Sequence, residues 1–457
     1  MKYKLMPHQA SAVEDGKDKS LALFFGCGCG KCLTAIELIK HHKGPALVVS
    51  PLTLIENSWR VDCNKFAPEL SVVSLWSKKP AERRERLAEK HDIYLVNFEG
   101  FKGLFDAIQK KKFNVIVVDE SAALKNVNSA ITRALLAMAG IKLRKRGGRV
   151  YPVNHIIPYR YCLSGCPAPN SDLEYYAQMK FITGPGDECF SDNFYSFRRM
   201  YAYGIPLSTP GQMIWKQIPA MRNQLLESMK PYSRVVMIED VLDLLPQRHI
   251  VRTVDLTTPE RVAYDTFKND LVLRFKDETV LASTALVAVM KLRQLTSGFM
   301  YGNDGLHWIG NTKLNELLEV LEEIGDNKVL IWANFREEIE MLNKAIPGSK
   351  TLYGGTKDKD DSISDFRDGD CKVLIANPMS AAHGLTFVGC HYNILFSLSY
   401  SYEFYEQLIH RTYRYGQKEG VIYYYIIAKN SIDEVVYNAV QSKGDMSSAA
   451  LQFLKGK

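Results

Sequence analysis

A glycine-rich loop followed by a lysine is the stretch of this 457-residue chain that most directly indicates chemistry. An apolar run of strand type, Leu21–Phe25, leads into Gly26-Cys27-Gly28-Cys29-Gly30-Lys31-Cys32, and apolar residues of helical period follow. Glycines let backbone N–H groups turn toward an anion, a helix N-terminus adds its dipole, and Lys31 supplies a point charge. The stretch therefore predicts a phosphate-binding loop, although Phe25 and Cys32 stand where Gly and Ser or Thr are usual.

Two adjacent carboxylates, Asp119 and Glu120, follow the apolar run at 115–118. They are expected at the carboxyl end of a strand, which is where α/β sheets bind their ligands. In a nucleotide enzyme, Asp119 would hold Mg²⁺ through water, and Glu120 would orient and deprotonate the attacking water. The alternative is a strand capped by exposed acids. The glycine loop upstream favours the catalytic interpretation, because the order and approximate spacing are those of a nucleotide hydrolase.

Gln407, Arg411 and Arg414 stand at i, i+4 and i+7, and are therefore expected to share one face of a helix. A solvated face would mix such residues with Glu or Lys. Two arginines and a glutamine among aromatic neighbours are more typical of phosphate ligands.

The interval between Glu120 and Asp172 contains no acidic residue. Its basic residues are Lys125, Arg133, Lys142, Arg144, Lys145, Arg146, Arg149 and Arg160. In a chain whose charges are otherwise balanced, such an interval predicts a surface that faces a polyanion. The net charge of +7 permits a polyanionic partner without requiring one.

The nine cysteines are scattered and odd in number, which argues against a disulfide framework. Cys27, Cys29 and Cys32 form the dense cluster, and a zinc site is the alternative interpretation of it. Their spacing is unlike the usual paired Cys-x-x-Cys, so the phosphate loop is favoured. No run of ~18 apolar residues could span a membrane, and the N-terminus lacks a signal peptide, so a cytoplasmic location is expected.

The elements that must position these residues form two α/β series. Strands alternate with helices from about residue 21 to 182, which indicates one doubly wound domain with a parallel sheet, and we expect this first domain to span 1–182. Aromatic and basic pieces with recurring Gly and Pro follow, and we interpret 183–298 as a helical insertion or connector. A second α/β domain is expected over 299–457, with strands near 328–335, 372–377 and 393–397.

The ordered set of motifs resembles the Swi/Snf-type ATPases of helicase superfamily 2, and particularly compact phage-encoded members that act on branched DNA. The resemblance covers about residue 5 to 440. Its motifs, in order, are Pro7-His8-Gln9, Gly28 to Cys32, Val49-Ser50-Pro51, Asp119 to Ala122, Leu163 to Pro167, Ala382 to Thr386, and Gln407 to Gln417. The ending Arg-x-x-Arg-x-Gly-Gln at 411–417 is the most specific of them.

The resemblance implies two RecA-like lobes with ATP between them. The residues implied to bind ATP are His8, Gln9, Gly28, Cys29, Gly30, Lys31, Cys32, Gly384 and Gln407, with Cys32 and Asp119 at Mg²⁺. Lys31, Asp119 and Glu120 would act from the first lobe, and Arg411 and Arg414 as arginine fingers from the second. Hydrolysis would then step the lobes along DNA.

Two departures from the family concern Cys32 and Cys166, which stand where the family has Thr. A neutral thiol is a poor substitute for a hydroxyl ligand to Mg²⁺, a hard ion that prefers oxygen. The expected function is an ATP-dependent DNA translocase or helicase, a monomer that remodels forks or junctions in replication or recombination. Alternatives are a nucleotide-switched clamp on DNA with little turnover, and a motor that displaces proteins from DNA.

A basic hairpin is expected as an insertion on the first lobe, at about 140–158. Gly147 and Gly148 suit the positive φ angles of a tight turn, and both flanks contain β-forming residues. The expected DNA-binding residues are Lys142, Arg144, Lys145, Arg146 and Arg149. Two interpretations stay open: a loop that touches phosphates non-specifically, and a rigid hairpin that parts or guides strands at a fork.

Overall fold

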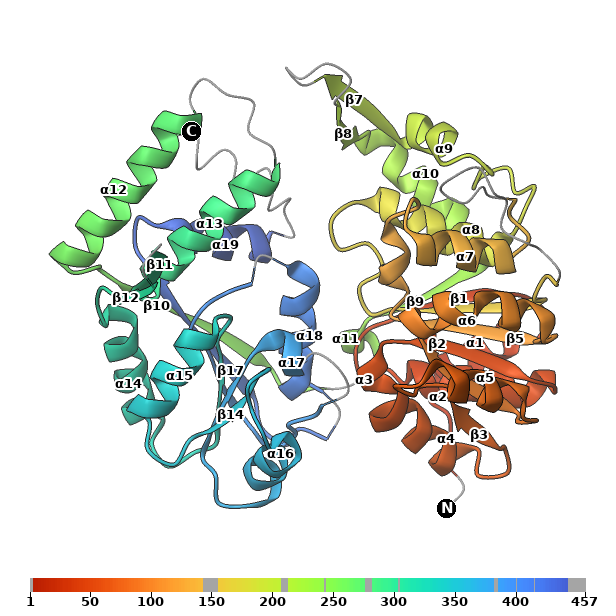
Figure 1. Ribbon diagram of the computed structural model, residues 1–457, viewed down its shortest axis with the longest axis horizontal. Coiled ribbons are helices and arrows are strands. Elements are labelled where there is room, and N and C mark those ends of the chain that lie inside the picture. Colours follow the sequence, from red (N-terminus) through yellow and green to blue (C-terminus); the bar gives the residue numbers. More distant parts are fainter. Residues whose placement is uncertain are drawn as a thin grey trace. The chain divides into compact units, whose positions relative to one another are not determined.

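The computed structural model describes residues 3–142, 155–206, 213–241, 244–275, 282–302, 305–381, 385–399, 401–414 and 416–442. The chain divides into two compact units, the first holding the described residues up to 241 and the second those from 244 onward (Figure 1). The expected three-part division stays a prediction. In the structure, the described part of 183–241 belongs to unit 1 and that of 244–298 to unit 2.

Unit 1 is built on a parallel sheet of seven strands. Their order is β3 (Val72–Ser74), β4 (Ile93–Asn97), β2 (Ala46–Ser50), β5 (Val115–Asp119), β6 (Tyr159–Leu163), β1 (Leu21–Phe25) and β9 (Ser233–Val236). All residues of the strands β1, β2 and β5 are buried, because a parallel sheet is covered by helices on both faces. Ala22 and Phe24 pack with α6 to α8, so the alternate residues of β1 face the opposite helix layer.

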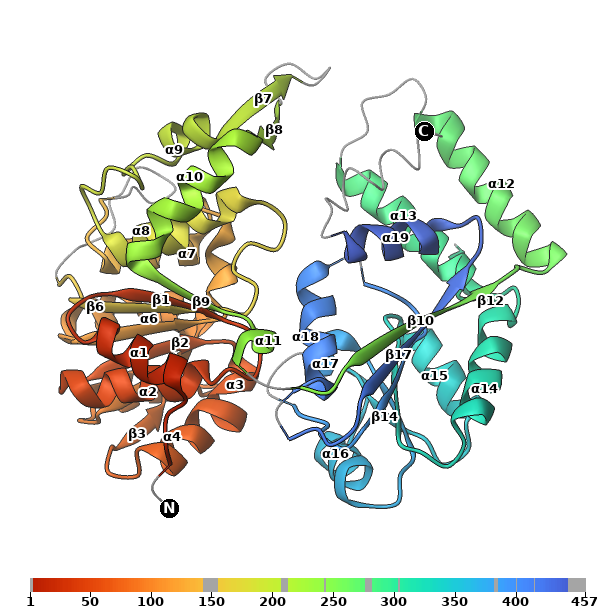
Figure 2. The same cartoon turned by 180° about the vertical axis from the view of Figure 1, so that it is seen from behind.

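The helices of unit 1 follow the strands in alternation (Figures 1 and 2). They are α1 (Pro7–Gly16), α2 (Lys31–His42), α3 (Leu52–Leu54), a π-helix (Ile55–Arg60), α4 (Val61–Phe66), α5 (Pro80–Ala88), α6 (Phe98–Lys110), α7 (Ala130–Met138), α8 (Tyr175–Thr183), α9 (Phe194–Tyr201), α10 (Pro219–Met229) and α11 (Ile238–Val241). Three 3-10 turns complete the unit: Ser121–Lys125, Asp172–Glu174 and Lys230–Tyr232.

The segment after residue 183 contains strands as well as the expected helices. An antiparallel pair, β7 (Ala202–Pro206) and β8 (Met213–Gln217), lies between α9 and α10. Further on, β9 joins the edge of the first sheet beside β1. Sequence analysis missed β9 because its four residues, Ser-Arg-Val-Val, are too few to show a period of two.

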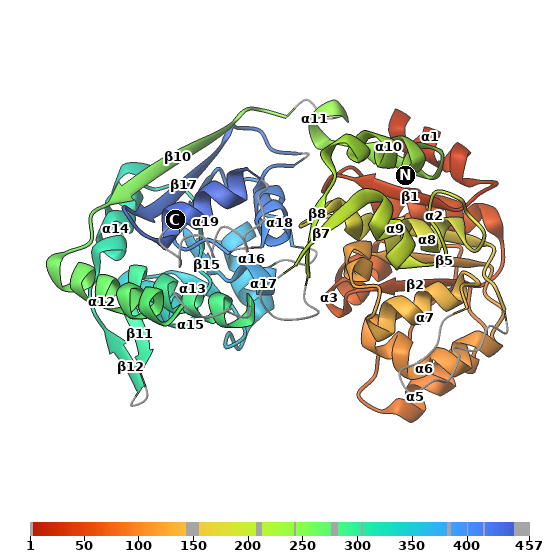
Figure 3. The same ribbon diagram turned by 90° about the horizontal axis from the view of Figure 1, so that it is seen from above.

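Unit 2 is built on a second parallel sheet, in the order β10 (Gln247–Val254), β17 (Val421–Ala428), β16 (Tyr392–Leu395), β13 (Val329–Trp332), β15 (Val373–Ala376) and β14 (Lys350–Leu352). Its helices are α12 (Thr258–Phe275), α13 (Ala282–Thr296), α14 (Thr312–Ile324), α15 (Arg336–Ala345), α16 (Lys359–Asp368), α17 (Pro378–Ala381), α18 (Tyr402–Thr412) and α19 (Ile432–Gln441). An antiparallel pair, β11 (Phe299–Gly302) and β12 (Gly305–Trp308), follows α13 (Figure 3).

Two α/β lobes with parallel sheets confirm the expected fold class. The expected basic hairpin falls mainly on residues 143–154, which lie outside the described residues. None of the helices in the described ranges combines the length and apolar character that a membrane span needs.

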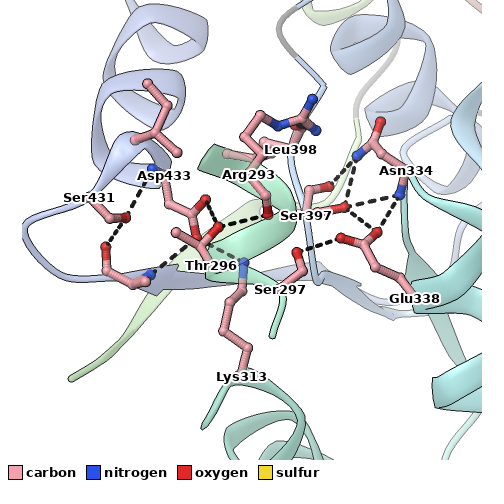
Figure 4. A network of polar contacts seen from close by, with 12 residues as sticks. Arg293, Thr296, Ser297, Lys313, Asn334, Glu338, Ser397, Leu398, Ser431 and Asp433 are labelled. Carbon is pink, nitrogen blue, oxygen red and sulfur yellow. Dashed lines mark hydrogen bonds and ion pairs between the residues drawn. The ribbon is translucent and has the colours of Figure 1, made fainter. Parts of the chain in front are cut away.

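A buried polar network joins distant segments of unit 2 (Figure 4). The Glu338 carboxylate is fully buried and accepts hydrogen bonds from the hydroxyls of Ser297 and Ser397 and from the backbone N–H of Asn334 and Phe335. Oε1 accepts from Ser297 alone and Oε2 accepts from the other three donors, and these four hydrogen bonds offset the cost of burying the group.

The Lys313–Asp433 ion pair lies in the same network. The Lys313 ammonium contacts Asp433 Oδ2 at 2.9 Å, and both side chains are almost entirely buried. Asp433 Oδ1 also accepts a hydrogen bond from the Thr296 hydroxyl at 2.9 Å. The pair joins the first residues of α14 and α19 to the end of α13, so it sets the placement of three helices.

We expect Asp433→Asn to destabilise unit 2 by about 3 kcal/mol, because it leaves the buried Lys313 ammonium without a counter-charge. Urea unfolding followed by circular dichroism measures the loss. The matched control is Asp255→Asn, which removes the ion pair between Asp255 and Lys429. The Asp255 side chain is 73% exposed. That variant should lose less than about 1 kcal/mol. Equal losses in the two variants would contradict the structural role given to Asp433.

Candidate active site

The glycine-rich loop connects β1 to α2 at the carboxyl end of the first sheet. Gly28 and Gly30 have φ angles of 87° and 80°, in the left-handed region that favours glycine. Helix α2 begins at Lys31, directly after Gly30. The loop thus has the backbone form that a phosphate-binding site requires, with N–H groups at a helix N-terminus available for an anion.

His8 and Gln9, on the first turn of α1, both contact this loop. His8 Nε2 lies 2.9 Å and Gln9 Nε2 3.2 Å from the carbonyl oxygen of Cys29. Since a carbonyl oxygen only accepts, His8 carries a proton on Nε2. Gln9 is buried, and its Oε1 accepts from the Met6 backbone N–H at 2.9 Å. The two residues expected to bind the nucleotide are therefore held against the loop expected to bind its phosphates.

Lys31 is held over the loop by backbone carbonyls. Its Nζ donates to the oxygens of Phe25 at 2.9 Å and Gly26 at 3.4 Å. Burial favours the neutral amine, but the electrostatic interactions with Cys27 and with the Glu120 and Asp119 carboxylates prevail and raise the Lys31 pKa. The side chain is therefore a charged ammonium beside the loop.

Asp119 ends β5 and is buried. Its Oδ2 accepts hydrogen bonds from Trp59 Nε1 at 2.8 Å and from the Ser50 hydroxyl at 3.3 Å, and its Oδ1 accepts from the Glu120 backbone N–H at 2.9 Å. Burial raises the pKa of Asp119, and the Trp59 hydrogen bond and the charge of Lys31 act against that rise. The carboxylate is oriented by three donors, two of them side chains.

Sequence analysis did not find the contact between Trp59 and Asp119. Trp59 lies on the π-helix after β2 and is fully buried. The sequence places Ser50 in the motif Val49-Ser50-Pro51 but gives no sign that its hydroxyl contacts Asp119. A lone tryptophan in an amphipathic stretch indicates core packing, and nothing in the sequence spacing indicates that its indole N–H meets a carboxylate 60 residues away.

Glu120 adopts a left-handed backbone conformation, with φ 50° and ψ 52°. Such a conformation is uncommon outside glycine and costs about 1–3 kcal/mol, and residues that keep it cluster at functional sites. It reverses the chain between β5 and the 3-10 turn Ser121–Lys125. The Glu120 side chain is partly exposed, whereas the adjacent Asp119 side chain is buried. The two carboxylates therefore have different environments, as their expected roles require.

The side chains of the site differ in how well they suit Mg²⁺. Asp119 offers the oxygen ligand that a hard cation prefers. Cys32 fits poorly: burial and the nearby charges of Asp119 and Asp62 raise the pKa of its thiol well above the usual range, so it remains neutral. Among the residues that the structure describes, no group of three or more His, Cys, Asp or Glu side chains could hold a metal ion, and this includes the cysteine cluster considered for zinc.

Gln178, a fully buried residue of α8, links two of the site's turns. Its Oε1 accepts from the Ser121 hydroxyl at 2.7 Å, and its Nε2 donates to the Pro167 carbonyl at 2.6 Å. The turn that ends at Pro167 also approaches the glycine loop, because a Cβ on Gly165 would lie 3.2 Å from Cys27 Sγ. Sequence analysis missed Gln178, which stands alone in an apolar helix.

In unit 2, the expected common face of Gln407, Arg411 and Arg414 is corrected by the structure. Gln407 and Arg411 lie on α18, but this helix ends at Thr412, and Arg414 lies in the following turn. The Gln417 side chain closes that turn: its Nε2 donates to the carbonyls of Cys390 and Thr412. Helical spacing fails here because the chain leaves the helix at Tyr413, whose ψ is 89°.

The other expected residues of this part are placed as follows. Gln407 is buried, and Arg411 Nη1 donates to the Leu385 carbonyl at 3.0 Å. Gly384 lies outside the described residues, as do Arg144, Lys145, Arg146 and Arg149. Lys142 is described and is exposed.

The sequence matches two family models. One is described as SNF2-related domain and matches residues 12–298. The other is described as helicase conserved C-terminal domain and matches residues 312–416. The first of these alone covers more than half of the chain.

Individual proteins are similar over nearly the whole chain. Protein p41 of Acyrthosiphon pisum secondary endosymbiont phage 1 is 26% identical and covers 94% of each chain. A DNA annealing helicase and endonuclease of Homo sapiens is 22% identical over 94% of this chain, which spans 38% of that protein's length. The SWI2/SNF2 ATPase core of Sulfolobus solfataricus in complex with dsDNA is 20% identical, with a TM-score of 0.44 and coverage of 99% and 97%.

We expect Gly30→Ala to weaken binding of a fluorescent adenine nucleotide at least about tenfold, because a Cβ there would lie 2.0 Å from Gln9 Nε2 on a backbone with positive φ. Equilibrium titration by anisotropy measures the change. Gly103→Ala is the matched control, since a Cβ at this helical position meets no atom within 4 Å. The variant should bind nucleotide normally. If Gly30→Ala binds the nucleotide as tightly as the unaltered protein, the assignment of this loop to the nucleotide site is wrong.

Proposed function

This chain belongs to the SNF2-related family and is thus an ATP-dependent enzyme of the helicase type, and we propose that it hydrolyses ATP in response to DNA and moves along the duplex. The observation that carries the proposal is that the carboxyl ends of four neighbouring strands in unit 1 lie at the same edge of the sheet. The order β2-β5-β6-β1 places Ser50, Asp119, Ser164 and the glycine loop along one edge of the sheet. That edge is where parallel sheets bind nucleotides.

In the proposed reaction, Lys31 and the N–H groups of residues 28–32 bind the ATP phosphates, and His8 and Gln9 bind the nucleotide beside them. Glu120 accepts a proton from the attacking water. Asp119, held by Trp59 and Ser50, would bind Mg²⁺ through an oxygen atom. When bound, Mg²⁺ supplies positive charge to the phosphates during transfer.

From unit 2, we assign to Arg411 and Arg414 the stabilisation of the charge that develops on the transferred phosphate. Gln407 and Gly384 are proposed as further nucleotide contacts. Helix α18 and the turn closed by Gln417 support the two arginines separately, one on the helix and one beyond it. Each arginine therefore has its own backbone support.

Duplex, forked or junction DNA is the proposed partner, and Lys142, Arg144, Lys145, Arg146 and Arg149 are proposed to contact it. The naming of the human relative as a DNA annealing helicase supports fork or junction remodelling as the task. We propose a monomer that acts in the cytoplasm, which is the cytoplasm of the host cell if the chain is phage-encoded; the similarity to a phage protein over 94% of each chain supports the latter. The alternatives are a nucleotide-switched clamp and a motor that displaces proteins from DNA. ATPase measured without DNA and with duplex, fork, junction or single strands separates clamp from motor, because a motor is strongly stimulated.

We expect Glu120→Gln to retain ATP binding and to lose at least about 100-fold in DNA-stimulated kcat, because it removes the proton acceptor. A coupled phosphate-release assay with saturating duplex DNA measures turnover, and nucleotide anisotropy measures binding. Glu99→Gln is the control, because Glu99 is an exposed residue that pairs with Lys102 on α6. Normal turnover in Glu120→Gln would refute the role of this carboxylate.

Cys32→Thr should give equal or higher Mg²⁺-dependent turnover, because a hydroxyl is a harder ligand than a neutral thiol. Cys189→Thr, a change at an exposed cysteine, serves as the control. In the unaltered protein, saturating ATP should also shield Cys32 from a thiol reagent, as measured by mass spectrometry of the labelled peptide. A several-fold loss of turnover in Cys32→Thr, or labelling insensitive to ATP, would contradict the placement of Cys32 under the phosphates.

A further inference from the structure

The β7–β8 pair is a two-stranded ribbon that extends from unit 1 beside α9 and α10 (Figures 1 and 2). Its base is closed by a hydrogen bond from the Ile218 N–H to the Tyr201 carbonyl at 2.9 Å. Tyr201 and the neighbouring Phe197 are buried in the core of unit 1. The ribbon is therefore anchored at one end in the hydrophobic core.

One face of the ribbon is occupied by the protein's own side chains. The Arg198 guanidinium lies 3.7 Å from the centre of the Trp215 ring. A Cβ on Gly204, which pairs with Trp215, would lie 2.9 Å from Met213 Sδ and 3.4 Å from the Trp215 ring. The absence of a side chain at Gly204 thus lets Trp215 and Met213 cover this strand, and Arg198 joins this face to α9.

The opposite face presents a different set of side chains. Tyr203 pairs directly with Lys216, and residues directly opposite in an antiparallel pair share a face. Ile205, two residues along from Tyr203, lies on that face as well. Tyr203 is 49% exposed, Ile205 is 36% exposed, and Lys216 is exposed. This outer face, defined by Tyr203, Ile205 and Lys216, therefore combines an aromatic ring, an aliphatic side chain and a cation in solvent.

The charged residues of the segment that forms the ribbon and its flanking helices are of one sign up to residue 226. No Asp or Glu occurs from residue 193 to 226, and the basic residues of this interval are Arg198, Arg199, Lys216 and Arg222. Arg222 is already paired with Asp172 at 2.9 Å, whereas Arg199 is exposed on α9 beside the ribbon. The Asp172 carboxylate also accepts a hydrogen bond from Gln217 of β8, but Gln217 alternates with Lys216 and lies on the opposite face of the ribbon. An exposed tyrosine together with cations is the composition of surfaces that stack bases and hold phosphates.

We propose that the outer face of the β7–β8 ribbon binds unpaired bases of DNA, with Tyr203 as the stacking platform, Ile205 as its apolar flank and Lys216 on the phosphates. The inference rests on the proposed function, because it needs a DNA-bound enzyme. It assigns to unit 1 a base-contacting surface formed by residues other than those of the basic interval between Glu120 and Asp172. A rigid ribbon anchored by Trp215 and Arg198 holds that platform in place.

The ribbon β11–β12 of unit 2 offers a matched comparison within the same chain. It also exposes a tyrosine and an aliphatic residue, Tyr301 at 41% and Leu306 at 39%. Its surroundings differ, because the Tyr301 hydroxyl donates to the carboxylate of Glu337. A carboxylate beside the ring disfavours a phosphate backbone, so this ribbon controls for the general effect of removing exposed apolar side chains.

The test uses three variants. The first is the double variant Tyr203→Ser, Ile205→Ser, the second is the control double variant Tyr301→Ser, Leu306→Ser, and the third is Tyr203→Phe. Binding to a single-stranded oligonucleotide, a blunt duplex and a fork is measured by anisotropy at one fixed salt concentration. We expect the first double variant to bind single strands and forks about tenfold more weakly, and the control double variant and Tyr203→Phe to bind as the unaltered protein does. A 2-aminopurine in the unpaired arm should be quenched by the unaltered protein, by Tyr203→Phe and by the control double variant, but not by the variant that lacks Tyr203 and Ile205.

The two hypotheses fail separately. If duplex DNA does not stimulate the ATPase activity of the unaltered protein, the proposed function is wrong. If it is stimulated, yet the Tyr203→Ser, Ile205→Ser variant binds single strands and forks as tightly as the unaltered protein, the ribbon proposal alone is overturned. Sedimentation of the same variant adds a further check. A change in self-association with unchanged DNA binding would assign the outer face to a protein contact instead. Unchanged melting temperatures confirm that the exposed substitutions leave the fold intact.

Discussion

The parallel alignment of β2, β5, β6 and β1 is the constraint on which the candidate active site depends. Segments that lie between residues 25 and 167 end at the same edge of the sheet only because every connection between these strands passes over a face and returns in the same direction. The alignment brings the glycine loop, the Ser50 hydroxyl, the two carboxylates and the turn before Pro167 together. None of these groups could carry out its expected role alone, so the expected reaction depends on the strand order that brings them together.

Much of the fold followed from the sequence because the signals were local. Buried runs such as residues 46–50 and 115–119 predict parallel strands, and the glycine-rich composition of the loop predicts a tight turn at a helix N-terminus, which the structure places directly before α2. The same local reasoning failed at Arg414, where α18 ends two residues earlier because Gln417 bonds the last helical carbonyl. A helix end can depend on a side chain that hydrogen-bonds back to the backbone, and the periodic pattern of the sequence does not predict such a contact.

The residues that orient the site were not visible in the sequence. Trp59 holds Asp119, and Gln178 holds two turns, through single hydrogen bonds across 60 and 57 residues. One tryptophan or one glutamine carries no spacing signal, and each residue type is common in cores for other reasons. The same applies to Glu338 and Asp433 in unit 2, whose partners come from several helices and strand ends. Long-range polar contacts are fixed by packing, so only the folded chain reveals them.

Under the catalytic role proposed for Glu120, its left-handed backbone sets stability and activity against each other at a single position. Glycine would adopt φ 50° without the steric cost that a side chain adds, so replacing Glu120 with glycine relieves the turn while removing the carboxylate. Selection or design that rewards resistance to unfolding alone would therefore drive this residue away from the acid.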